Sequence, residues 1–170
     1  IVEKASLENE FLAFVTQNQG IAHKVCNIYC SEKEAKKDLF QEIVFQLWKG
    51  YPKFNKQSKI TTWMYRVALN TAITFYRKEK RIPQQDSLTE GIYNMSDAIS
   101  TETEEMLKQL YKAIEQLNKI EKALILLYME ENSYEEIAAI VGITKTNVGV
   151  KINRIKSKLE RIIKKEHINA

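Results

Sequence analysis

The segment from residue 59 to residue 81 combines aromatic, amide and guanidinium side chains at helical spacing. After Lys59, one helical face would carry Trp63, Arg66, Val67, Asn70, Thr74, Arg77 and Arg81. Unstacked bases lie against aromatic rings, arginine holds phosphate, and an asparagine amide reads a base edge through paired hydrogen bonds. This face therefore favours binding of single-stranded nucleic acid. A core position is the alternative for Trp63, and for Tyr65 on the opposite face it is the one we expect.

A second polar face lies near the carboxyl end of the sequence. The apolar residues that repeat at helical spacing, and that we expect to be buried, are Val148, Ile152, Ile155, Leu159 and Ile162. The residues that point away from them are Thr146, Val150, Asn153, Arg154, Ser157 and Arg161. Lys145, Gly149 and Lys151 complete this candidate set for contacts with duplex DNA.

A short helix and a tight turn precede that second face. Ser133 and Glu136 have the spacing of a capping box, in which each side chain bonds the backbone of the other residue. Gly142 favours the left-handed conformation that ends a helix, and Thr144 can cap the next one. Together these features predict a helix-turn-helix, whose second helix enters the major groove. A hairpin with a packing role only is the alternative.

A helix predicted over residues 34–50 has two unlike sides. The side that we expect to be buried carries Leu39, Phe40, Ile43, Val44, Leu47 and Trp48. The other side carries Asp38, Gln41, Glu42 and Phe45. An aromatic ring among polar groups is a typical anchor of a protein interface. A single exposed phenylalanine without a partner is an equally good interpretation of the spacing alone.

Other candidate sites are weak. His23, Cys26 and Cys30 share one helical side, but a fourth zinc ligand is missing. We expect reduced cysteines packed in a core helix and neither metal nor cofactor. The sequence has no glycine-rich phosphate loop, nucleophile elbow or zinc-protease motif, so it does not predict an enzyme or a small-molecule substrate.

Composition and charge predict how these sites are arranged. The chain has 170 residues, 44% of them hydrophobic, with only 5 Gly and 2 Pro, which favours an all-α protein. Residues 49–81 carry a net charge of +8, residues 82–106 carry −6, and residues 145–165 carry +7. We expect two helical domains, 1–81 and 107–166, joined by a flexible acidic linker over 82–106, because only the basic blocks suit phosphate. With no apolar run of membrane-spanning length and no signal segment, we expect a cytoplasmic protein.

The chain resembles the bacterial RNA polymerase sigma factors of the extracytoplasmic-function group. Three motifs carry the resemblance, and they cover residues 38–45, residues 62–72, and residues 124–159 with the capping box and Gly142. The resemblance implies that Asp38, Gln41, Glu42 and Phe45 dock on the clamp helices of the largest polymerase subunit. It implies that residues 62–72 open and read the minus-ten promoter element, and that the carboxy-terminal domain reads the minus-thirty-five element.

The resemblance also implies partners beyond DNA. These are core RNA polymerase, including the flap of its second-largest subunit, and an anti-sigma factor, as in many relatives. Gly149 and Val150 depart from the family pattern, in which Lys or Arg and then Ser are common. Two rival functions are a polymerase-independent regulator of duplex DNA and a recombinase, for which no nucleophile and acidic cluster are found.

Overall fold

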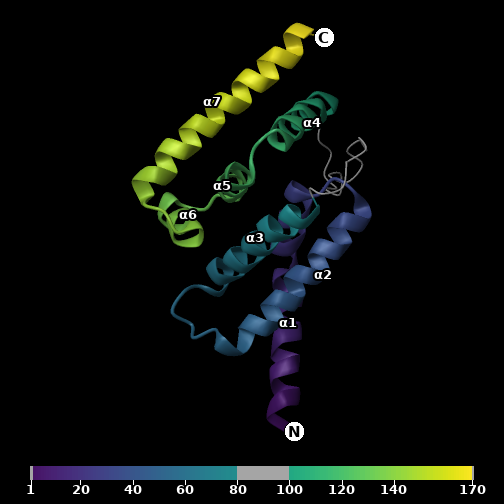
Figure 1. Cartoon of the computed structure of the whole chain (residues 1–170), viewed down its shortest axis with the longest axis vertical. Helices are drawn as coiled ribbons and strands as arrows, with labels where there is room; N and C mark the ends of the chain where they lie inside the picture. The colour runs from purple at the N-terminus through teal and green to yellow at the C-terminus, as the bar shows by residue number, and fades with distance from the viewer. Residues whose placement is uncertain (1, 80–99, 170) are drawn as a thin grey trace. The chain divides into compact units, whose positions relative to one another are not determined.

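The computed structural model describes residues 2–79 and 100–169, and within these ranges every regular element is a helix. The all-α prediction is confirmed for this part of the chain. The helices form two compact units, α1 to α3 and α4 to α7, which Figure 1 shows along the colour gradient. Each unit is described by itself below.

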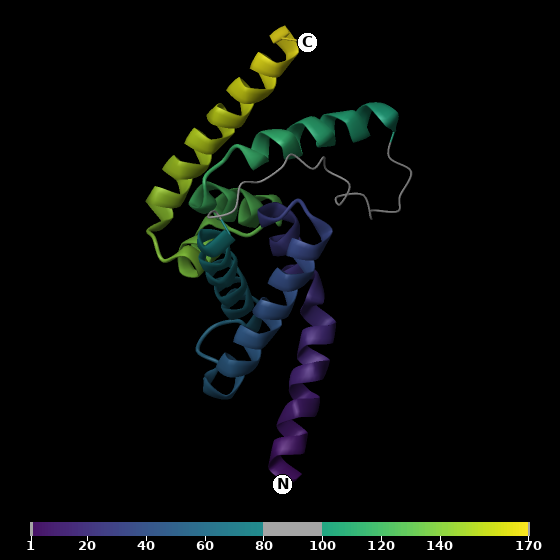
Figure 2. The ribbon, with the colours of Figure 1, turned by 45° about the vertical axis from the view of Figure 1, so that its right-hand side comes forward.

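The amino-terminal unit is built from three mutually packed helices. Its elements in chain order are α1 (Val2–Tyr29), α2 (Lys33–Gly50), the 3-10 turn η1 (Tyr51–Lys53) and α3 (Ile60–Glu79). Its largest fully buried side chains are Val25, Cys26, Leu39, Ile43, Leu47 and Met64. The first turns of α1 extend beyond the other two helices in both views of the ribbon (Figures 1 and 2).

An aromatic cluster joins the carboxyl end of α2 to both neighbouring helices. Its members are Phe11, Phe14, Trp48, Tyr51, Phe54 and Trp63. Ring centroids lie 5.0 Å apart for Phe11 and Trp48, and 5.0 Å apart for Phe54 and Trp63. Because aromatic pairs at such distances add to the energy of apolar burial, this cluster helps to hold α1, α2 and α3 together.

In the carboxy-terminal unit, the last helix packs against each of the other three. The elements are α4 (Thr101–Glu115), α5 (Lys119–Met129), α6 (Tyr134–Val141) and α7 (Lys145–Asn169). The predicted buried stripe is confirmed for Val148, Ile152, Ile155 and Leu159, while Ile162 is half-buried. These side chains meet a core that includes Ile114, Leu124, Leu127 and Ile137.

A helix begins inside the segment that was expected to be the linker. Helix α4 starts at Thr101, inside the segment expected to be the linker. The hydroxyl of Ser100 accepts a hydrogen bond from the Thr103 N–H at 3.3 Å and so caps the helix. Glu102 and Glu104 lie in the first turn, where the helix dipole favours negative charge, so acidic composition here marks a helix start. Most of the expected linker, residues 82–99, lies outside the described residues.

Candidate nucleic-acid interface

The polar face of α3 forms much as the spacing predicts. Arg66, Asn70 and Thr74 are exposed on successive turns, and Tyr65 is buried in the core as expected. Lys59 is exposed just before the helix, and its carbonyl accepts a hydrogen bond from the Trp63 N–H at 3.1 Å. Arg81 and the side chain of Arg77 lie outside the described residues. The structure thus brings together an indole, a guanidinium and an amide on one surface.

The sequence left open whether Trp63 lies in the core or on the exposed face of its helix, and the structure combines the two positions. Its indole is half-buried, and its ring centroid lies 6.2 Å from that of Phe14 and 6.5 Å from that of Tyr51. The same residue stands one turn before Arg66 and two turns before Asn70 on the exposed side. The indole of Trp63 therefore packs against the aromatic cluster and is also partly exposed to solvent.

The helix-turn-helix is confirmed in detail. The Ser133 hydroxyl accepts a hydrogen bond from the Glu136 N–H at 3.2 Å, and Glu136 accepts one from the Ser133 N–H at 2.8 Å. Gly142 has φ +80° and ends α6 in the left-handed conformation. Thr144 caps α7 by accepting a hydrogen bond from the Asn147 N–H at 3.2 Å. The predicted capping box, glycine turn and second cap are all present.

The outward face of α7 is polar with one apolar side chain. The exposed residues on it are Thr146, Val150, Asn153, Arg154, Ser157 and Arg161. Gly149, beside this face, is partly covered by the ring of Tyr134, since a Cβ built on the glycine would lie 3.4 Å from Tyr134 Cε2. The glycine that departs from the family pattern therefore lies against an aromatic ring of the preceding helix.

Two lysines of the candidate set act on carboxylates within the carboxy-terminal unit. Lys145 donates to the Glu135 carboxylate at 2.5 Å across the turn of the motif. That hydrogen bond lowers the pKa of the Glu135 carboxyl. Lys151 shares the side of Lys158, seven residues on, and its charge helps to lower the pKa of Glu121 in α5. Lys151 is exposed and stays a predicted contact with DNA.

Two polar contacts tie the long helix α7 to α5. Lys158 Nζ donates to Glu121 Oε2 at 2.9 Å, and Lys156 Nζ donates to the Tyr128 hydroxyl at 2.6 Å. Burial by itself would raise the pKa of Glu121, but hydrogen bonds from Lys158 and from the Asn118 N–H hold it below its usual value. The buried stripe of α7 sets its rotation, and these two contacts add to the packing of α7 on α5.

The α2 surface differs from the prediction on its apolar side. Leu39, Ile43 and Leu47 are buried as expected. Three further residues of the expected core, Phe40, Val44 and Trp48, are only half-buried. The cause is that α1 crosses this side without covering it completely, which leaves an open groove of about 630 Å³ between the two helices.

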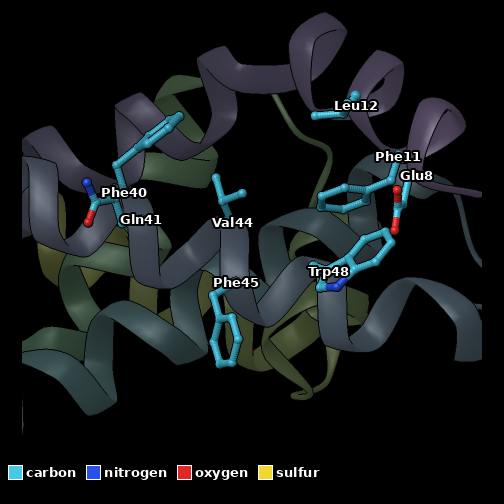
Figure 3. A pocket seen from close by; sticks show the side chains of 8 residues that line it. All are labelled: Glu8, Phe11, Leu12, Phe40, Gln41, Val44, Phe45 and Trp48. Carbon is cyan, nitrogen blue, oxygen red and sulfur yellow. The ribbon is translucent and has the colours of Figure 1, made fainter. Parts of the chain in front are cut away.

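The groove connects with the surface of Phe45. The residues that line it are Glu8, Phe11, Leu12, Phe40, Gln41, Val44, Phe45 and Trp48. Figure 3 shows Val44 pointing toward α1 and Phe45 projecting from the next position of α2. Phe45 is 53% exposed and Leu12 is 61% exposed, so large apolar groups meet solvent at both edges. Sequence reasoning missed Leu12, although its four-residue spacing from Glu8 places the two on one side of a helix.

The three residues considered as metal ligands, His23, Cys26 and Cys30, differ in their surroundings. Cys26 and Cys30 are buried, whereas His23 is exposed and stacks on Phe40 with ring centroids 4.5 Å apart. Burial raises the pKa of the Cys26 thiol to about 12, which keeps the sulfur protonated. Among the described residues, no group of three or more His, Cys, Asp or Glu side chains could hold a metal ion.

A helix-turn-helix with an exposed polar reading face defines a helical DNA-binding protein. Comparison with known families gives a narrower class. Sigma-70 region 2 matches residues 14–82, and Sigma-70, region 4 matches residues 107–159. The chain is 30% identical over 136 residues to RNA polymerase sigma factor YlaC of Bacillus subtilis, covering 75% of this chain and 77% of that protein. The chain belongs to the RNA polymerase sigma factors, in the extracytoplasmic-function group.

A further relative agrees with this assignment, and two solved structures share the fold. The ECF RNA polymerase sigma-E factor of Haemophilus influenzae is 28% identical over 138 residues, covering 74% of this chain and 73% of that protein. The fold is similar to CnrH in complex with the cytosolic domain of CnrY, with a TM-score of 0.67, 16% identity and coverage of 92% and 89% of the two chains. It is also similar to the sigma factor RpoE from Bartonella quintana in complex with the anti-sigma factor NepR, with a TM-score of 0.65, 19% identity and coverage of 94% and 97%.

Membership in this family gives the general function of the chain. Sigma factors are initiation factors that bind core RNA polymerase and promoter DNA, and they act as regulators and not as catalysts. Among the described residues, no helix is long and apolar enough to cross a membrane.

Proposed function

We propose that this sigma factor reads the minus-thirty-five element as duplex through α7 and the minus-ten element as a melted non-template strand through α3. The observation that carries the proposal is that one chain has two exposed polar surfaces of unlike chemistry. The α7 surface is a helix-turn-helix with exposed amide, guanidinium and hydroxyl groups, which suits the major groove. The α3 surface presents the indole of Trp63 beside Arg66 and Asn70, which suits unstacked bases.

Docking on polymerase belongs to α2 in this proposal. Phe45 is an exposed ring with the Lys49 ammonium 5.6 Å from its centroid, and Asp38 and Gln41 are exposed on the same helix. Glu42 is half-buried and accepts a hydrogen bond from Gln46 at 2.8 Å. An aromatic anchor with polar neighbours fits the clamp helices of the largest subunit, to which the family resemblance assigns this segment. The carboxy-terminal unit then meets the flap of the second-largest subunit.

An anti-sigma factor is the further partner in this proposal. The two structural neighbours described above were each solved with a bound partner, which for RpoE is the anti-sigma factor NepR. By analogy with those proteins, we expect this chain to be held inactive by such a partner in the cytoplasm.

Run-off transcription with core polymerase tests the whole proposal. Templates drawn from a randomised promoter library should give specific transcripts only when this chain is added. Sequencing the selected templates should show two separated conserved elements. A chain that binds selected duplex DNA but never directs core polymerase to a start site would instead be a polymerase-independent regulator.

A further inference from the structure

Val150 is an apolar side chain in the middle of the polar face of α7. It is 43% exposed and lies two residues after Val148, which is fully buried. Because consecutive residues of an α-helix are about 100° apart around its axis, Val150 points to the side opposite the core of its unit. The exposed valine is thus not the edge of the core, unlike Ile162, which is half-buried at the end of the buried stripe.

The fold itself gains little from a valine at this position. A β-branched side chain loses rotamer freedom in a helix, so valine has a lower helix propensity than alanine, lysine or glutamate. Packing offsets that cost at buried positions such as Val148 and Ile152. Val150 faces away from those contacts, so its role lies in what the outward face binds.

The amino-terminal turns of the second helix are the part of a helix-turn-helix that reaches base edges. On the outward face before Asn153, Thr146 and Val150 are both exposed, and both carry methyl groups. Lys145 is paired with a carboxylate of α6, and Gly149 has no side chain to present. This end of the face therefore offers methyl groups, whereas amide and guanidinium groups follow further along the helix.

Thymine is the base whose major-groove edge matches this chemistry. Its C5 methyl group projects into the groove, whereas cytosine has a hydrogen at the same carbon. Contact between that methyl group and a valine removes the apolar surface of both from water. Valine has no side-chain group that could hydrogen-bond a base edge, so its contribution to recognition is of this apolar kind.

We infer that Val150 is a specificity-determining residue that selects thymine in the minus-thirty-five element by contact with the C5 methyl group of the base. The inference rests on the proposed reading of duplex DNA by α7. Recognition along this helix is then divided, with apolar contact at Val150 and hydrogen bonding from Asn153 onward.

Replacement of thymine by uracil tests the methyl contact with the full chain assembled in the holoenzyme. Uracil keeps every hydrogen-bonding group of thymine and lacks only the methyl group. Promoters that the wild-type holoenzyme selects from a randomised library should contain thymine in the minus-thirty-five element. At one such position, uracil should weaken closed-complex binding about fourfold, which is the effect of one methyl-sized apolar group. Val150→Ala should bind the thymine and uracil promoters equally, so the two changes are not additive.

A second modified base measures the same contact with different hydrogen-bonding groups. 5-Methylcytosine carries the methyl group at the same carbon but pairs with guanine. At the position that is sensitive to uracil, the wild type should bind 5-methylcytosine more tightly than cytosine, and Val150→Ala should not distinguish them. Val150→Ile keeps a branched apolar side chain and should keep both methyl preferences.

Two controls separate base recognition from folding. Ile120→Ala truncates a branched apolar side chain that is 46% exposed in α5, and it should leave the uracil effect as in the wild type. Val150→Ala should unfold at the wild-type temperature or above it, because alanine is the better helix former and no core contact is lost. A clear loss of stability would show that Val150 packs within its unit and would overturn the inference.

The results also distinguish this inference from the proposed function. Equal uracil effects for the wild type and Val150→Ala at every thymine of the element, or an element without thymine, would overturn the inference while α7 still reads duplex DNA. Loss of affinity for core polymerase by Val150→Ala, with the selected motif unchanged, would assign the residue to a protein interface and also overturn it. Selection that yields no conserved upstream element would refute the proposed reading by α7 itself.

Discussion

Asn153 and Arg154 occupy neighbouring exposed positions of α7 but present different chemistry to DNA. An amide reads a base edge through paired hydrogen bonds, whereas a guanidinium on the flank of the face holds phosphate. Asn153→Ala should therefore relax preference at one base pair of the minus-thirty-five element. Arg154→Ala should weaken binding to all sequences and reduce the salt slope by about 1. Selection from randomised promoters and salt titrations measure the two effects. A selected motif identical to the wild type's for Asn153→Ala would refute base reading by that residue.

Individual residues show where sequence reasoning succeeds and where it stops. Tyr65 and the four-residue core of α7 follow from helical spacing, because periodicity identifies the apolar side of a helix. Phe40 was placed in the core by the same rule and lines a groove instead. Periodicity does not tell how much of an apolar side the neighbouring helix covers. The close approach at Gly50, where an added Cβ would lie 3.0 Å from Trp63 Cζ2, is likewise invisible in sequence, since it depends on an indole from another helix.

At the scale of elements, Gly142 makes the turn between α6 and α7 possible. Its φ of +80° costs a non-glycine residue about 1 to 2 kcal/mol, although a Cβ there would meet no atom within 4 Å. Gly142→Ala should therefore lower the stability of the carboxy-terminal unit. Gly20→Ala, also free of steric contact but inside α1, should raise stability by up to about 1 kcal/mol. Scanning calorimetry of both variants tests whether the same substitution has opposite signs at the two sites.

The contact between α5 and α7 gives a prediction about pH. The pKa of Glu121 is lower in the folded chain than in the unfolded chain, because hydrogen bonds from Lys158 and Asn118 outweigh burial. Its charged form therefore stabilises the fold fully above the ordinary pKa of about 4.3, and this contribution is lost as pH falls through the lower folded value.

The variant Glu121→Gln isolates that charge, because an amide oxygen can still accept from the Asn118 N–H. Near neutral pH it should lose at most about 1 kcal/mol, since both partners are partly exposed. The difference from the wild type should shrink as pH falls below about 4.3. Glu115→Gln, at an exposed position of α4, is the control for removal of one negative charge. Unfolding by urea at several pH values measures both; a difference that grows toward acid would contradict the sign of the pKa shift.

Element boundaries were predicted best where the chain carries its own caps. Ser133, Gly142 and Thr144 act through backbone contacts within a few residues, so their sequence pattern was sufficient. The start of α4 was missed because its acidic first turn resembles a solvated linker by composition alone. The surroundings of two lysines in α7 were harder still to predict. Lys145 donates to Glu135 across the turn, and the charge of Lys151 acts on Glu121 of α5, and neither relation follows from helical spacing.

Across the whole molecule, the two basic segments lie in different units. Residues 49–81 carry a net charge of +8 and residues 145–165 carry +7, and they contain the α3 and α7 surfaces respectively. Duplex DNA presents phosphate to both, but bases are presented to an aromatic surface only after the strands separate. Recruitment to a promoter and its opening are therefore expected to depend on different residues.

Asn70→Ala tests that separation most directly. Asn70 is exposed on α3, two turns after Trp63, so its removal should leave the fold and holoenzyme assembly intact. Closed-complex binding should fall little, whereas open-complex formation should lose about 1 to 3 kcal/mol, the value of one stacked or bidentately read base. A template with a pre-melted bubble should recover part of the defect, because the cost of unpairing is already met.

Permanganate footprinting of the minus-ten element on linear and bubble templates measures both quantities. Asn27→Ala is the control, since it makes the same substitution at an exposed position of α1. If the defect is one of base capture, it is larger on the linear template, and the control behaves as the wild type on both. Two results would show that α3 does not read the melted strand through this residue. One is that Asn70→Ala opens linear promoters at the wild-type level. The other is that Asn70→Ala loses affinity for core polymerase and not the ability to open the promoter.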